Sequence, residues 1–173
     1  MTGARGEYGR RDAEGSMFAA SDMCEMQLQP RDADASRSGH GPTATILIAE
    51  DEPLILGLLA EILRHRGYTV LVACDGAAAL AIYEKQRVSL LITDVDMPRM
   101  DGRELARRVR QMTPELPLLF MSGAVTATEL APAELSGPTR FLDKPFSFTT
   151  LVDQVEELLA GADAHPPLAL HAN

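Results

Sequence analysis

Short apolar runs alternate along the middle of this chain with stretches in which apolar residues recur at helical spacing. The runs lack the polar alternation of a half-exposed strand, so they predict strands that are buried on both faces. The stretches between them predict helices that pack one face against a sheet. The predicted strands are Ile46–Ala49, Tyr68–Ala73, Leu90–Thr93, Leu118–Met121 and Phe141–Asp143.

Helices are predicted between and after these strands. Gly67 ends the first of them, and Asp101 is an N-cap for the third, with Glu104 placed to complete a capping box. Five strand–helix pairs imply right-handed crossovers and a doubly wound parallel α/β sheet with helices on both faces. The predicted helices cover residues 54–63, 77–83, 101–109, 126–135 (a weak helix that contains Pro132) and 147–159.

A chain of 173 residues is long enough for one domain with tails, since domains average about 150 residues. Residues 1–44 are rich in Gly, Arg, Asp and Ser and have no lasting period, so we expect a disordered leader. An alternative start codon within this leader stays open. The folded domain is expected over 45–160, followed by a short flexible tail over 161–173.

Charge and composition exclude several classes of protein. The 16 basic and 25 acidic residues give a net charge of −9, which argues against direct binding to nucleic acid. No apolar run approaches the roughly 18 residues that cross a bilayer, so no membrane partner is expected. Two cysteines cannot build a disulfide framework, and the four histidines have no zinc-ligand spacing. The expected location is therefore the cytoplasm.

Chemically reactive side chains follow four of the five predicted strands. In an open parallel sheet the carboxyl ends of the strands meet at one edge, where ligands bind. Carboxylates crowded at such an edge repel one another unless a cation lies between them. Mg²⁺ is suited to a site with a few carboxylates, water and a phosphate. The side chains at this edge are Glu50, Asp51, Asp94, Ser122 and Lys144.

Asp94 is the natural centre of this group, because it ends a buried strand and precedes a loop stiffened by Pro98. An ionised carboxylate can attack phosphorus without a general base and form an acyl phosphate. Lys144 is placed to neutralise a phosphoryl oxygen, and Ser122 to donate a hydrogen bond to another. The strand ends thus predict a site that accepts a phosphoryl group.

Four motifs carry a resemblance to a known family. They are Ile46–Pro53 (ILIAEDEP), Thr93–Gly102 (TDVDMPRMDG), Met121–Gly123 (MSG) and Lys144–Phe146 (KPF). Together they resemble the receiver domain of response regulators in two-component signalling, over about residues 44–159. The resemblance implies a flavodoxin-like sheet with strand order 2-1-3-4-5. It further implies that Asp94 receives the phosphoryl group from a histidine kinase phosphohistidine.

The resemblance also assigns metal ligands. It implies that Asp51 and Asp94 bind Mg²⁺ directly, that the Asp96 backbone carbonyl is a third ligand, and that Glu50 acts largely through water. Glu50 stands where an aspartate is more frequent in the family. The extra methylene keeps the charge, and we expect it to be tolerated.

The remaining site residues are assigned to the switch. Ser122 matches the family's switch hydroxyl, Phe141 its switch aromatic and Lys144 its lysine. On phosphorylation Ser122 is expected to move toward the phosphoryl oxygen, and Phe141 to fill the vacated space. The Lys144–Pro145 peptide bond is expected to be cis, as is usual in the family.

Two other functions compete with this interpretation. Asp94-Val95-Asp96 matches the signature of a haloacid dehalogenase-type phosphatase, although the acidic pair precedes the lysine and no room is left for a cap. A binding module that is never phosphorylated is the other alternative. We favour a stand-alone receiver that is not an enzyme beyond its own phosphorylation and dephosphorylation. Its expected partners are a sensor histidine kinase or histidine phosphotransfer protein and a downstream protein effector.

Overall fold

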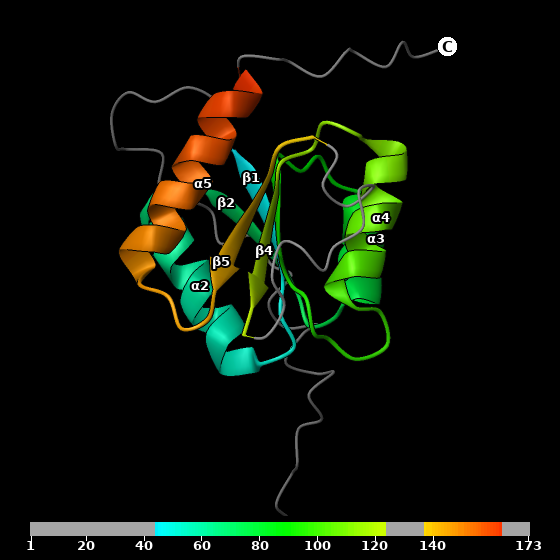
Figure 1. Cartoon of the computed structure of the whole chain (residues 1–173), viewed down its shortest axis with the longest axis horizontal. Helices are drawn as coiled ribbons and strands as arrows, with labels where there is room; N and C mark the ends of the chain where they lie inside the picture. Colours follow the sequence, from blue (N-terminus) through cyan, green and yellow to red (C-terminus); the bar gives the residue numbers. More distant parts are fainter. Residues whose placement is uncertain (1–43, 124–136, 164–173) are drawn as a thin grey trace, which may run out of the picture.

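A parallel sheet of five strands forms the centre of the computed structural model (Figure 1), which describes residues 44–123 and 137–163. Every neighbouring pair of strands is parallel, and the order across the sheet is β2-β1-β3-β4-β5. This confirms the predicted topology. The strands are β1 (Thr45–Ala49), β2 (Thr69–Ala73), β3 (Leu90–Asp94), β4 (Leu118–Ser122) and β5 (Thr139–Asp143).

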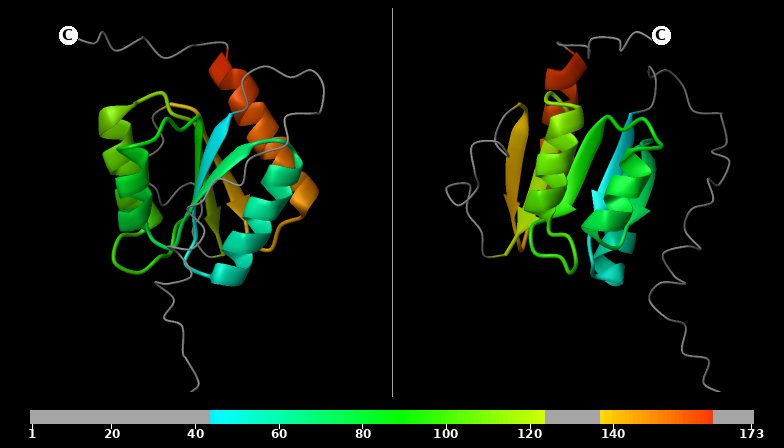
Figure 2. Two further views of the ribbon diagram at one scale, coloured as in Figure 1. Left: turned by 180° about the vertical axis from the view of Figure 1, so that it is seen from behind. Right: turned by 90° about the vertical axis from the view of Figure 1, so that its right-hand side faces the viewer.

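Helices cover both faces of the sheet, as predicted. In Figures 1 and 2, α2 and α5 lie on one face, and α3 and α4 lie on the other. The described helices are α2 (Pro53–His65), α3 (Gly76–Tyr83), α4 (Gly102–Met112) and α5 (Phe148–Asp163). The weak helix predicted over 126–135 lies outside the described residues.

Alternate side chains of the strands pack into two apolar layers, one on each face of the sheet. Ile46 and Ile48 pack with the buried residues of α2 and α5, whereas Leu47 packs with those of α3 and α4. β3 and β4 are buried along their whole length. The continuous apolar runs in the sequence follow from this double burial, since neither face of a central strand meets water.

Helix ends agree with the sequence in part. Gly67 follows the last turn of α2 with a positive φ of 91°, a conformation that glycine adopts without strain. The Asp101 carboxylate caps α4 by accepting a hydrogen bond from the Glu104 N–H at 2.8 Å. The Glu104 carboxylate pairs with Arg107 and Arg108, so its predicted part in a capping box is replaced by ion pairs along the helix.

Several elements extend beyond their predicted limits, among them α4, which ends at Met112. β5 begins at Thr139, because Thr139 pairs with Leu118 of β4 in spite of the polar residues before Phe141. α5 continues to Asp163, four residues beyond the predicted end at Leu159. Within the described ranges, none of the helices combines the length and apolar character needed to cross a membrane.

Candidate functional site

Two acidic side chains meet because β1 and β3 are neighbours in the sheet. Ala49 pairs with Thr93, so the residues that follow them, Glu50 and Asp94, lie side by side at the carboxyl edge. Carboxylate oxygens of Glu50, Asp51 and Asp94 all lie within 4.8 Å of one another. Glu50 is fully buried and Asp94 nearly so, whereas Asp51 is half-buried at the mouth of the site.

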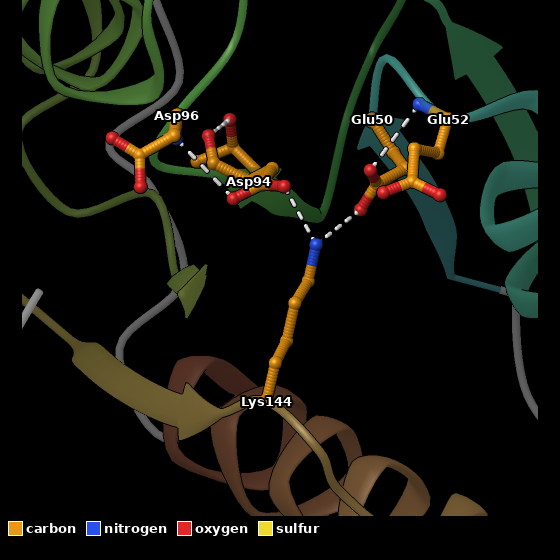
Figure 3. A network of polar contacts seen from close by, with 6 residues as sticks. Glu50, Glu52, Asp94, Asp96 and Lys144 are labelled. Atoms are coloured by element: carbon orange, nitrogen blue, oxygen red, sulfur yellow. Dashed lines mark hydrogen bonds and ion pairs between the residues drawn. The ribbon is translucent and has the colours of Figure 1, made fainter. Parts of the chain in front are cut away.

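Lys144 reaches the two buried carboxylates from the other side of the site (Figure 3). It directly follows β5, and its Nζ donates to Glu50 Oε2 at 2.8 Å and to Asp94 Oδ2 at 2.6 Å. The Lys144 main-chain N–H donates to the Ser122 carbonyl at 2.8 Å, which fixes where the side chain starts. The Lys144–Pro145 peptide bond is cis, as predicted.

Burial and pairing act against each other on these charges. Burial raises the pKa of Glu50 above 4.5, and the neighbouring Asp94 raises it further, although the contact with Lys144 opposes both. For Lys144 burial alone would lower the pKa, yet its hydrogen bonds to Asp94 and Glu50 leave the pKa raised above 10.5. One ammonium therefore faces three carboxylates, and the site keeps an excess of negative charge.

The acidic cluster suits a hard divalent cation. Its ligand atoms are oxygens from three carboxylates, a set that Mg²⁺ prefers. The set contains no sulfur ligand of the kind that soft metals prefer. Asp96 lies just beyond the cluster, and its main-chain N–H donates to Asp94 Oδ1 at 3.3 Å (Figure 3). The carboxylates of three predicted metal ligands, Glu50, Asp51 and Asp94, are thus brought together, while the role of the Asp96 carbonyl and the split between direct and water-mediated ligands stay predictions.

The two predicted switch residues lie on adjacent strands. Ser122 ends β4, is buried and belongs to the same strand edge as Asp94. Phe141 is half-buried in β5, and its ring stacks on Phe120 with ring centroids 5.5 Å apart and planes 9° from parallel. Their movement on phosphorylation stays a prediction.

Sequence analysis missed a pair of charged residues next to the site. Arg99, in the loop after β3, forms an ion pair with Asp75, which caps α3. The cap itself was detectable, because Asp75 precedes Gly76 and an Ala-rich helix. The ion pair was not, since it joins loops that are far apart in the sequence.

Comparisons with known proteins agree with this geometry. Residues 46–156 match the family model of the response regulator receiver domain. The receiver protein CpdR of Brucella abortus is 35% identical over 117 residues, which are 68% of this chain and 98% of CpdR. The chain spans only about half of two Mycobacterium tuberculosis transcriptional regulators, 53% of TcrX and 46% of TrcR.

Solved structures show the same fold. The receiver domain of the hybrid histidine kinase CckA is 39% identical, covers 67% of this chain and 99% of that domain, and gives a TM-score of 0.57. TrrA of Thermotoga maritima, crystallised in complex with Mg²⁺–BeF, is 28% identical with a TM-score of 0.61. That match covers 68% of this chain and all of TrrA.

Proposed function

This chain belongs to the response regulator receiver family, and we propose that Asp94 accepts a phosphoryl group from the phosphohistidine of a partner protein, with Mg²⁺ bound beside it. One observation carries this proposal. Three carboxylates converge at the carboxyl edge of the sheet, and the Lys144 ammonium contacts two of them. Such a pocket combines a nucleophile with an ammonium that can stabilise a transferring phosphoryl group, and with oxygens that suit a second cation.

The transfer is a single displacement at phosphorus. A carboxylate oxygen of Asp94 forms a bond to phosphorus as the bond between phosphorus and the donor imidazole nitrogen breaks. The electron pair of the broken bond returns to the imidazole, which takes a proton. Because Asp94 reacts as a carboxylate, it needs no general base, and the product is an aspartyl phosphate.

The residues around Asp94 hold and orient the group that is transferred. Lys144 is already within hydrogen-bonding distance of Asp94 and is placed to shift its ammonium to a phosphoryl oxygen. Ser122 is placed to donate its hydroxyl to another phosphoryl oxygen. Mg²⁺ held by Asp51, Asp94 and the Asp96 carbonyl, with Glu50 through water, would neutralise the remaining oxygens.

The partners are proposed from the relatives. Part of the CckA sensor kinase of Brucella abortus is 36% identical to this chain, and the match covers 13% of that kinase. A sensor histidine kinase, or a histidine phosphotransfer protein that relays from one, is therefore the proposed donor. Phosphorylation would then move Ser122 and Phe141 and alter a surface that a downstream protein recognises, in the cytoplasm.

Acetyl phosphate tests the proposal without knowledge of the kinase. The full chain is incubated with acetyl phosphate and MgCl₂, and the phosphorylated fraction is measured on a phosphate-affinity gel. We expect one acid-labile phosphoryl group per chain, which disappears when EDTA replaces MgCl₂. Asp94→Asn should abolish it, whereas Asp153→Asn, on the exposed face of α5, should not. Label that persists on Asp94→Asn would exclude Asp94 as the acceptor.

The same sample separates the two competing functions. The family match favours neither of them. Repeated turnover of p-nitrophenyl phosphate would identify a phosphatase, whereas a receiver carries at most one phosphoryl group per chain. If the wild type takes up none with Mg²⁺ present, the site is instead an unphosphorylated binding module.

A further inference from the structure

The loop between β3 and α4 is attached to a second loop at its far end. Arg99, in the β3–α4 loop, donates a hydrogen bond from its guanidinium to Asp75 Oδ2, in the turn between β2 and α3. Next to this pair, the Gly76 N–H donates to the Met100 carbonyl at 3.3 Å. A Cβ on Gly76 would lie 2.4 Å from that carbonyl oxygen, so the two loops are in backbone contact.

Asp75 is a fixed point for this attachment. Its side chain is only 7% exposed, and its Oδ1 accepts the Ala78 N–H at 2.8 Å to cap α3. Burial alone would raise its pKa, but the hydrogen bonds from Ala78 and Arg99 lower the pKa below 3.8, which keeps it ionised. The carboxylate is thus held by a helix while its second oxygen holds the loop.

Arg99 has an unusual backbone conformation. Its φ is 67°, and among the described residues it is the one non-glycine with positive φ. This left-handed conformation costs energy in a residue that has a Cβ, so the surroundings must impose it. The Arg99 side chain is 66% exposed, and such an ion pair adds little to stability on its own. The ion pair therefore acts mainly on the conformation of the loop.

The near end of the same loop lies in the phosphorylation site. The Asp96 N–H donates to Asp94 Oδ1, and the Gly102 N–H donates to the Val95 carbonyl at 3.0 Å. The segment that presents the Asp96 carbonyl is therefore fixed on one side by the site itself. On the other side it is fixed by the contacts of Arg99 and Met100.

We propose that Asp75 and Arg99 are positioning residues, which hold the β3–α4 loop so that the Asp96 carbonyl faces the divalent cation. This inference rests on the proposed function, and it adds two residues outside the acidic cluster to the machinery of phosphorylation. Without the pair, the loop samples conformations in which the carbonyl points elsewhere. Mg²⁺ then binds more weakly, because part of its affinity is used to restore the loop.

Long-range electrostatics predicts the opposite sign for Arg99. Removing a positive charge near an acidic pocket makes the potential there more negative and strengthens cation binding. If Arg99 acts only as a charge, Arg99→Gln therefore tightens Mg²⁺ binding. If it positions the loop, the same substitution weakens binding. The sign of one change in affinity thus separates the two explanations.

The experiment is a titration of the full chain with MgCl₂, followed by the backbone amide signals in NMR. We expect the Mg²⁺ dissociation constant to rise about tenfold in Arg99→Gln and in Asp75→Asn, the lower end of what is usual when groups that orient a metal ligand are lost. Asp75→Asn keeps an oxygen that can cap α3. The double variant should be no weaker than either single one, because both remove the same contact. Arg99→Lys should recover part of the affinity.

Arg108→Gln is the matched control, because it removes the same charge from a residue whose guanidinium pairs with Glu104 along α4. It should leave the Mg²⁺ dissociation constant within about twofold of wild type, as expected for a surface change. A second measurement needs no metal. Amide hydrogen exchange at Gly76 should quicken about tenfold in Arg99→Gln, since its acceptor carbonyl is released.

The outcomes separate this inference from the proposed function. Unchanged or tighter Mg²⁺ binding in Arg99→Gln, in a protein that still takes up phosphate on Asp94, overturns the role of the pair alone. Additive losses in the double variant overturn it as well. A wild type that neither binds Mg²⁺ nor accepts phosphate overturns the proposed function instead.

Discussion

The two edges of the sheet each hold a cation, but they stabilise it in opposite ways. At the carboxyl edge Lys144 lies between the carboxylates of Glu50 and Asp94. At the amino edge Arg110 of α4, which is 5% exposed, donates to the Pro114 and Pro138 carbonyls and to the Thr139 hydroxyl. One cation is paired with charges, and the other with neutral oxygens.

This difference is visible in the proton affinities of the two cations. The carboxylates around Lys144 raise its pKa in spite of burial. Arg110 is buried, which lowers its pKa to about 10, and the more distant Glu115 and Tyr83 compensate only in part. At the carboxyl edge the cation is thus stabilised by opposite charges. The amino edge uses charge to tie α4 to the loop before β4 and to the start of β5.

Lys144→Met is expected to have the largest effect on phosphorylation, because it removes the cation at the carboxyl edge. Without the ammonium, a phosphoryl group would meet uncompensated carboxylates, and the rate of phosphorylation by acetyl phosphate should fall about 100-fold. Mg²⁺ binding should become tighter, because a competing cation is gone. Rates come from phosphate-affinity gels, with Lys85→Met, an exposed lysine after α3, as the control. An unchanged rate would contradict the role given to Lys144.

Arg110→Met tests the amino edge. The substitution removes the hydrogen bonds from the guanidinium to the Pro114 and Pro138 carbonyls and the Thr139 hydroxyl, so the free energy of unfolding should fall by about 3 kcal/mol in urea titrations. Arg110→Lys should not restore it, because one ammonium cannot replace a planar fork of donors.

The readout for Arg110→Met also includes function. Phosphorylation measured well below the unfolding transition should stay within about twofold of wild type. A large loss of phosphorylation in the folded variant would show that the two edges are not separable. Arg108→Met, on the exposed side of α4, should change stability by less than about 0.5 kcal/mol.

The pH dependence of stability sharpens the comparison further. Burial raises the pKa of Glu50 above 4.5 in the folded protein. As pH falls, Glu50 therefore takes up a proton in the folded protein at a higher pH than in the unfolded chain. In metal-free buffer the Glu50 contribution to the free energy of unfolding should therefore increase as pH falls from neutral toward 4.5, and be lost again as pH rises through the folded pKa. Glu50→Gln should lack this contribution. The free energies of unfolding of wild type and Glu50→Gln are compared by urea titration across this pH range. If both change with pH in parallel, Glu50 makes no such contribution.

Ser122→Ala is expected to have the smallest effect on the chemistry. One hydrogen bond to the phosphoryl group is lost, so the phosphorylation rate should fall only about threefold. The link to Phe141 should suffer more. Adding Mg²⁺ and beryllium fluoride should shift the ring signals of Phe141 in the wild type, and shift them less in Ser122→Ala. Equal shifts in both proteins would show that the Phe141 ring does not respond through Ser122.

The carboxyl edge was predictable from sequence, whereas the amino edge was not. Apolar runs such as Leu90–Thr93 reveal strands that are buried on both faces, and parallel pairing then brings the polar residues after them to one place. No local pattern reveals the burial of Arg110. It sits beside Val109 in a helix with four arginines, and its acceptors come from loops that only the fold brings near.

The boundary residues of several elements were missed for a related reason. Thr139 belongs to β5 because Leu118 pairs with it, although Thr139 and Arg140 lie outside the apolar run that predicted the strand. Asp75 caps α3 and also receives Arg99, and only the first of these roles can be read from neighbours in the chain. Sequence patterns thus locate elements and strand ends, while contacts between loops depend on the finished packing.

Gly102 allows the start of α4 to lie directly against the end of β3. A methyl group at this position would lie 2.1 Å from the Asp94 carbonyl oxygen, so the first turn of α4 touches the backbone of the proposed phosphoacceptor with no side chain between them. Packed backbone is nearly incompressible. A displacement of the Asp94 main chain would consequently move the start of α4 with it, and a larger residue at position 102 would force the two apart.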